Sequence, residues 1–100
     1  MRSQSRILPV VCVIAGMVAG TAACSRDSRV AKAELIARGQ KHADQRAYPE
    51  ASIEFRKAIQ KDPRDGNTRV KLAETLLKMG QGAEGIREYL RASDLLPADA

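Results

Sequence analysis

Catalytic and metal-binding side chains are scarce in this chain. His42 is its only histidine, and Cys12 and Cys24 are its only cysteines. Metal centres and nucleophile–base pairs are built largely from clusters of these residue types, and the sequence also lacks a glycine-rich phosphate loop and a nucleophile elbow. We therefore expect no catalytic residues, no metal site and no cofactor, and we interpret His42 as a packing residue of a non-enzymatic protein.

Aromatic residues are equally scarce. The chain has no tryptophan, and Tyr48, Phe55 and Tyr89 are its only aromatic residues. Proteins that bind single strands of nucleic acid stack bases on aromatic rings along a basic groove. Here the Lys and Arg residues are interleaved with Glu and Asp, in the pattern of solvated helix faces. A nucleic-acid partner is therefore not expected.

A repeated pattern runs through the second half of the chain. A small, an aromatic, a second small residue and a proline recur in the same order and at the same spacing. They are Ala51, Phe55, Ala58 and Pro63 in the first copy, and Gly85, Tyr89, Ala92 and Pro97 in the second. Each copy has an apolar stripe at helical spacing that leads into a helix-stopping proline. A fixed period of about 34 residues is typical of stacked helical repeats.

A further helical pattern precedes each of these two helices. The first runs from about Val30 to Asp44, and the second from about Asn67 to Met79. Gly80 follows the second pattern and stands where a helix commonly ends with a left-handed residue. The sequence therefore predicts an all-α fold of antiparallel helix pairs.

This pattern resembles the tetratricopeptide repeat, a helix–turn–helix unit with the same period and the same order of small, aromatic and proline positions. Mapped onto this chain, the first repeat spans residues 32–65 and the second spans residues 66–99, stacked as a solenoid. The chain departs from the family pattern at five positions. Leu35 and Arg69 stand in place of tryptophan, His42 and Leu76 in place of tyrosine, and Gly85 in place of alanine.

The resemblance also implies where a partner would bind. In such arrays the first helix of each pair lines a concave groove, which receives an extended or helical segment of another protein. Ile36 and Val70 stand where chaperone-binding members have the first basic residue of their carboxylate clamp, so that specificity is not expected. By the repeat register, the polar candidates for the groove are Gln40, Asp44, Asn67, Glu74 and Lys78.

The N-terminus has the composition of an export signal. Arg2 and Arg6 precede an almost wholly apolar segment, residues 7–20, which is followed by the small residues Thr21, Ala22 and Ala23. A basic start, an apolar segment and small residues before a cleavage site are typical of a secretory signal. Without Arg2 and Arg6, the basic residues exceed the 12 acidic ones by three instead of five.

The small residues before Cys24 resemble a bacterial lipobox, whose cysteine takes a diacylglycerol lipid and becomes the mature N-terminus. Thr21 stands where that motif usually has leucine. We therefore expect residues 1–23 to be a lipoprotein signal peptide, and residues 24–31 to be the lipidated Cys24 with a short tether. A retained membrane anchor is an alternative, although residues 7–23 are shorter than the roughly 20 residues of a span. Secretion after cleavage near Ala23 is another.

The lipobox resemblance implies a location in the bacterial cell envelope. Ser25 follows the lipidated cysteine, where an aspartate would resemble a signal for retention in the inner membrane. For a source with two membranes, this favours the outer membrane, with the repeats facing the periplasm. The expected membrane contact is the covalent lipid on Cys24.

Together these patterns predict a membrane-tethered scaffold that mediates protein–protein interactions. The chain is similar to the N-termini of long bacterial tetratricopeptide lipoproteins, including those of exopolysaccharide and PEP-CTERM protein-sorting systems, through its Lys61, Asp62 and Pro63 turn. A targeting module of a longer enzyme and an assembly factor for a secretin or another outer-membrane complex are alternatives. The apolar side of the last helix, around Ile86 and Leu90, has no covering helix, so we expect a fragment of a longer array or self-association.

Overall fold

The computed structural model describes residues 8–97 of the chain, which form α-helices and no strand. The helices are α1 (Leu8–Asp44), α2 (Tyr48–Lys61), α3 (Gly66–Lys78) and α4 (Gly82–Leu95). The all-α prediction is therefore confirmed for these residues. Two parts of the expected organisation lie outside them, namely the basic start of the signal with Arg2 and Arg6, and the end of the second repeat at Ala98 and Asp99.

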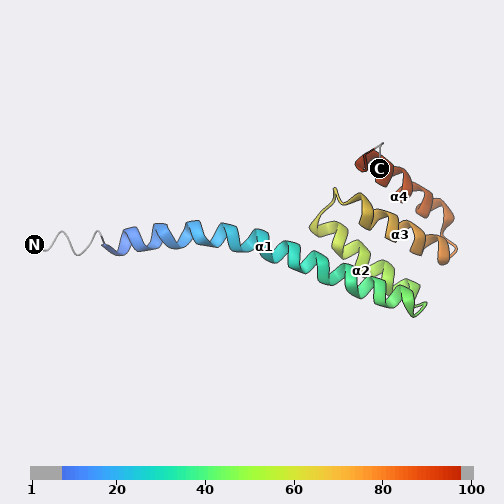
Figure 1. The fold of residues 1–100 in the computed structure, drawn as a ribbon, viewed down its shortest axis with the longest axis horizontal. Helices are drawn as coiled ribbons and strands as arrows, with labels where there is room; N and C mark the ends of the chain where they lie inside the picture. The colour runs from blue at the N-terminus through green and yellow to red at the C-terminus, as the bar shows by residue number, and fades with distance from the viewer. Residues whose placement is uncertain (1–7, 98–100) are drawn as a thin grey trace, which may run out of the picture.

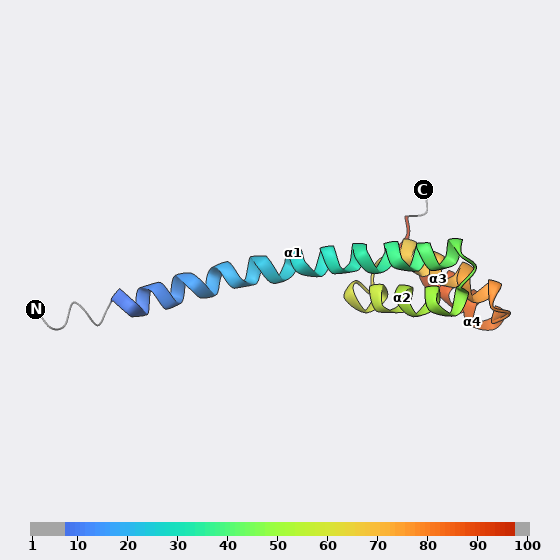
Figure 2. The same ribbon diagram turned by 90° about the horizontal axis from the view of Figure 1, so that it is seen from below.

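The helices form two antiparallel hairpins that pack against each other. α2 folds back on the C-terminal part of α1, α4 folds back on α3, and α2 also contacts α3 (Figure 1). α4 begins and ends one full sequence period after α2 begins and ends. The two helices therefore recur with the same spacing as the residue pattern in the sequence. The N-terminal part of α1 extends well beyond the other helices (Figure 2).

The first helix begins earlier than the sequence pattern indicated. α1 starts at Leu8, so the expected start near Val30 is wrong, and residues 24–31, for which we expected a short tether, are helical. From residue 21 to residue 38 the chain has no proline and no glycine. Pro9 lies in the first turn, where its missing N–H breaks no helical hydrogen bond. Nothing in the sequence therefore interrupts the helix between the apolar segment and the first hairpin.

The turns inside the two hairpins have the same geometry. Gly80 has a φ of 78°, which confirms the expected left-handed residue after α3, and Arg46 occupies the equivalent position one repeat earlier with a φ of 61°. In each turn a carbonyl oxygen accepts two N–H groups, from the residues just before and just after this position. The acceptor is His42 in the first turn, at 3.1 and 2.8 Å, and Leu76 in the second, at 3.1 and 2.9 Å. Both helices therefore end in the same capping arrangement.

The core lies where α2 meets α1 and α3. Its cluster of buried side chains consists of Ala51 and Phe55 from α2 with Leu72 and Leu76 from α3. A Cβ atom at Gly39 of α1 would lie only 2.6 Å from Cε1 of Phe55, so the ring packs directly on the α1 backbone. Among the positions that define the expected repeats, Ala51, Phe55, Ala58, Gly85 and Ala92 are buried, Tyr89 is half-buried, and Pro63 and Pro97 are exposed just beyond the helix ends.

Arg69 links the second hairpin to the turn that precedes it. Its Nη1 atom lies 3.0 Å from Oε2 of Glu88 on α4, and both side chains are largely buried. Its Nε and Nη2 atoms donate to the carbonyl oxygen of Pro63 at 3.2 and 3.0 Å. Arg91 contacts the other carboxylate oxygen of Glu88. A charge-assisted network therefore ties α3 to α4 and to the preceding turn through Arg69.

Candidate protein-interaction groove

A groove with a volume of about 220 Å³ lies between α1 and α3, and side chains of α2 also line it. Antiparallel hairpins that pack side by side bring these two helices close together, although the whole of α2 separates them along the chain. The residues that line the groove are Gln40, Ala43 and Asp44 of α1, Tyr48 and Phe55 of α2, and Lys71, Glu74, Thr75 and Lys78 of α3.

Most of the polar residues that the repeat register selected lie together at this groove. Gln40, Asp44, Glu74 and Lys78 line it. Asn67 does not line it, because it lies in the first turn of α3, beyond the end of the hollow, where it is exposed. The structure therefore brings four of the five candidates to one surface.

Three polar residues of the groove, Tyr48, Lys71 and Thr75, were not among the candidates from the sequence, and Lys71 is the charged one. Its ammonium group donates to Oε1 of Gln40 at 3.3 Å, and the amide of Gln40 donates to Oδ1 of Asp44 at 2.9 Å. A hydrogen-bonded chain thus connects α3 to α1 across the groove. The signal that identifies Lys71 is helical spacing, since it precedes Glu74 by three residues and Lys78 by seven and so shares their face.

The floor of the groove is apolar and its rim carries charges of both signs. The half-buried Ala43 and Tyr48 supply carbon surface, whereas the ring of Phe55 is 1% exposed and only closes the bottom of the hollow. The hydroxyl of Thr75 donates to the carbonyl oxygen of Lys71 at 2.8 Å, so its proton is used within α3. Two ammonium groups and two carboxylates surround this floor. An apolar floor with a few polar groups at its edge suits a peptide side chain that is anchored by contact area and oriented by rim hydrogen bonds.

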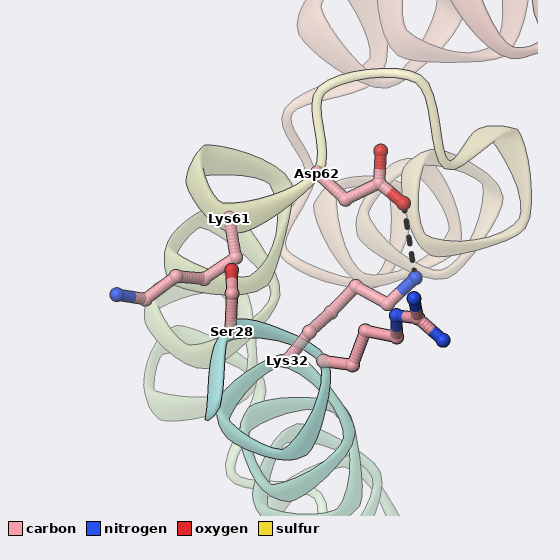
Figure 3. Close-up of a pocket in the computed structure, with 5 residues that line it drawn as sticks. Ser28, Lys32, Lys61 and Asp62 are labelled. Carbon is pink, nitrogen blue, oxygen red and sulfur yellow. Dashed lines mark hydrogen bonds and ion pairs between the residues drawn. The ribbon is translucent and has the colours of Figure 1, made fainter. Parts of the chain in front are cut away.

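A second hollow lies at the other end of the hairpins, where α1 emerges from them. It has a volume of about 320 Å³ and is lined by Ser28, Arg29 and Lys32 of α1 together with Lys61 and Asp62 at the end of α2 (Figure 3). Lys32 makes the ion pairs of this region, with its Nζ atom 3.0 Å from Asp62 and 3.3 Å from Asp65. These contacts hold α1 against the turn between α2 and α3.

Both partners of the Lys32–Asp65 pair have shifted pKa values. The hydrogen bond to Asp62, with further help from Asp65, raises the pKa of Lys32 above its usual value despite the opposing effect of burial. Burial alone would raise the pKa of Asp65, but hydrogen bonds from the hydroxyl and N–H of Thr68 and from Lys32 outweigh it and lower that pKa. Both groups are therefore charged at neutral pH, and Asp65 also caps α3.

A third feature is an apolar surface on α4. Ile86 and Leu90 lie one turn apart on this helix and are 57% and 60% exposed, and Leu95 near its end is 38% exposed. The corresponding position of Ile86 in the first hairpin is Ser52, which is buried. The exposure that we expected on the last helix is therefore confirmed for these three side chains.

Comparisons with known proteins add no assignment to these surfaces. Neither the protein-family models, nor the curated proteins, nor the solved structures include a match to this chain. Within the described part of the chain, none of the helices combines the length and the apolar character that crossing a membrane requires. The same residues hold no group of three or more His, Cys, Asp or Glu side chains arranged for a metal ion.

Proposed function

We propose that this chain is a scaffold of the tetratricopeptide type that holds a segment of a partner protein in the groove between α1 and α3. The observation that carries the proposal is the composition of this groove, in which the carbon surface of Ala43 and Tyr48 is framed by a polar chain from Lys71 through Gln40 to Asp44. The recurrence of α2 as α4, one period later, supports the repeat assignment.

The rim charges suggest the chemistry of the partner segment. Lys71 and Lys78 offer ammonium groups, whereas Asp44 and Glu74 offer carboxylates, so neither sign dominates. A segment with one apolar side chain for the floor and flanking charges of both signs matches this surface better than a uniformly acidic or basic one. A groove of this size accommodates one or two side chains, so the affinity of these two hairpins alone is modest.

We further propose that the N-terminal segment tethers the scaffold to the bacterial cell envelope through a lipid on Cys24. The expected location is the outer membrane. The support is the order of basic, apolar and small residues before this cysteine. Several acyl chains hold a protein firmly at a bilayer, since each buried CH₂ contributes about 0.8 kcal/mol.

Intact-mass analysis of the full chain from a bacterial envelope tests the tether. With the lipoprotein signal peptidase active, we expect a species that begins at Cys24 and carries acyl mass, and with the peptidase inhibited we expect residues 1–23 to be retained. An unmodified chain, or cleavage near Ala23 without lipid, contradicts the lipid anchor while leaving the groove proposal intact.

Site-specific photo-crosslinking in the envelope tests the groove. A photoreactive residue at Lys78 in the rim is expected to form a covalent adduct with a partner, and the same residue at Lys57, which is exposed on α2 away from the groove, serves as the matched control. Lys71→Glu is expected to abolish the adduct because it adds a carboxylate beside Gln40. Equal adducts at both positions, or an adduct that Lys71→Glu leaves unchanged, count against the groove.

A further inference from the structure

Four basic side chains gather at the end of the hairpins from which α1 emerges. Arg26 and Arg29 lie one turn apart on α1, Lys61 is the last residue of α2, and Arg64 lies in the turn that follows. The hollow lined by Ser28, Arg29 and Lys61 shows that α1 and the end of α2 meet at the same level (Figure 3). We call Arg26, Arg29, Lys61 and Arg64 the basic collar.

The charges of the collar are available to an outside partner. All four side chains are exposed, and none of them forms an ion pair within residues 26–97, whose side chains the structure describes. The nearby carboxylates of Asp62 and Asp65 are engaged by Lys32. The exposed Asp27 on α1 and Asp94 near the end of α4 still leave the four collar cations in excess. Figure 3 shows the Lys61 side chain pointing away from the Lys32–Asp62 pair. The collar therefore presents positive charge outward.

The opposite end of the hairpins lacks this excess of positive charge. Its exposed basic residues Lys41, Arg46 and Lys78 are accompanied by the exposed acidic residues Asp44, Glu50 and Glu74. The asymmetry follows the direction of α1, since the positive end is the one that leads into the apolar sequence of residues 8–23.

We propose that the basic collar binds the phosphate groups of anionic lipid headgroups and so fixes how the scaffold stands on the membrane. The proposal rests on the membrane attachment proposed above. Arg29 follows Cys24 by five helical residues, or about 8 Å along the axis of α1. The headgroup region of a leaflet is about 5–8 Å thick, so a chain attached at or before Cys24 places the collar at the depth of the phosphates.

Arginine and lysine are suited to this contact, because guanidinium and ammonium groups donate charge-assisted hydrogen bonds to phosphate oxygens. The orientation has a consequence for the groove. Asp44 in its rim is the last residue of α1, so the helical rise places the rim about 30 Å from Cys24 along the axis of α1, beyond the headgroup region when the helix stands upright. At that distance the groove is open to partners in the aqueous compartment.

The protection of Lys61 from a water-soluble amine-acetylating reagent tests the proposal. The full chain is reconstituted into lipid nanodiscs of pure phosphatidylcholine and into discs that contain phosphatidylglycerol, and acetylation is followed by peptide mass. We expect Lys61 to react about fivefold more slowly in the anionic discs, and the difference to vanish in concentrated salt. Lys78 at the opposite end is the internal control, with the same rate in both discs.

Two variants separate the collar from general charge effects. Arg29→Gln/Arg64→Gln is expected to remove most of the protection of Lys61, whereas the matched pair Arg38→Gln/Arg46→Gln, which lies outside the collar, leaves it intact. Circular dichroism establishes that both variants keep their helices.

Protection that is equal in the two disc compositions overturns the collar while the membrane attachment stands. Protection conferred by a soluble acidic peptide but not by anionic lipid also overturns it, in favour of a protein partner. A chain that does not remain with discs of either composition overturns the attachment and the collar together.

Discussion

At the scale of single residues, the clearest strain in the described chain lies at Arg46. It has a φ of 61°, and it is the only residue other than glycine with a positive φ there, whereas the second turn uses Gly80 in the same place. A left-handed conformation costs a residue with a Cβ atom about 1–2 kcal/mol. The exposed Arg46 side chain makes no ion pair among the described residues that would offset this cost.

Arg46→Gly is therefore expected to raise the free energy of unfolding by about 1 kcal/mol, measured from the urea midpoint. Gly80→Ala is expected to lower it by a similar amount, since alanine then carries the strain. The control is Arg38→Gly in the interior of α1, which is expected to destabilise by about 1 kcal/mol because glycine weakens a helix. A neutral or destabilising result for Arg46→Gly contradicts the assignment of strain to this turn.

Asp65 combines a helix cap with an ion pair, and these roles can be separated. Its pKa is lowered in the folded state, so the stability that its charge contributes is present above the ordinary aspartate pKa near 3.8 and is lost as the pH falls through the lower folded value. Lys32 has a raised pKa, so its contribution is present below pH 10.5 and is lost as the pH rises through the higher folded value.

Asp65→Asn keeps a capping oxygen for Thr68 and removes the charge that faces Lys32. We expect a loss of about 0.5–1 kcal/mol at pH 7 that shrinks to zero at acidic pH, where the wild-type carboxylate is protonated as well. Urea midpoints measured from pH 2 to pH 7 give this comparison. An equal loss at every pH assigns the effect to capping geometry instead of charge.

At the scale of the helices, the sequence predicted the periodic parts of the fold well and the long first helix poorly. The apolar spacing placed both ends of α3 to within a residue, and the prolines placed the ends of α2 and α4 to within two residues, because each helix buries a stripe against a neighbour. The start of α1 was wrong because the polar residues Ser25 to Arg29 were interpreted as a tether. Their helical backbone depends on the absence of a breaker, which periodicity does not report.

The residues of the candidate groove were likewise predicted only in part. Gln40, Asp44, Glu74 and Lys78 followed from the repeat register, because equivalent positions in stacked helices face the same side. Lys71 was missed although its helical spacing from Glu74 and Lys78 places it on their face. Only its contact with Gln40, 31 positions away, depends on how α1 and α3 pack. The basic collar could not be predicted from the sequence, because Arg29 and Lys61 come together only in the folded hairpin.

The contact between α1 and α2 depends on the small size of Gly39. A Cβ atom there would overlap the ring of Phe55 at 2.6 to 3.0 Å, and Phe55 is itself fully buried. Gly39→Ala is therefore expected to lower the free energy of unfolding by about 1–3 kcal/mol, although alanine favours the helix, because the ring and α1 must move apart. Gly82→Ala is the matched control, since a Cβ atom at Gly82 meets nothing within 4 Å. Urea denaturation compares the two, and equal stabilities contradict close packing at Gly39.

At the scale of the whole molecule, the two hairpins differ in what covers their second helix. α2 is packed between α1 and α3, whereas α4 has α3 on one side and presents Ile86 and Leu90 on its surface. Repeat arrays hide such a surface under the next helix or under a partner. In the orientation proposed above, with the collar toward the membrane, this surface would lie to the side of the hairpins, within reach of a second copy.

Self-association through α4 is the prediction that follows. We expect the full chain in detergent to show concentration-dependent dimers in sedimentation equilibrium, and Ile86→Glu/Leu90→Glu to shift it to monomers, because burying two carboxylates in an apolar contact is unfavourable. These side chains are more than half exposed, so the double variant is expected to cost the monomer little stability, about 0.5 kcal/mol or less at each site.

Ile53→Glu is the matched control, since Ile53 is 51% exposed on α2 and its equivalent on α4 is Arg87, next to the apolar pair but outside it. Dimers that persist in the double variant, or that Ile53→Glu abolishes equally, place the contact elsewhere. A membrane attachment would strengthen the association further, because tethering confines the copies to a surface and raises their effective concentration.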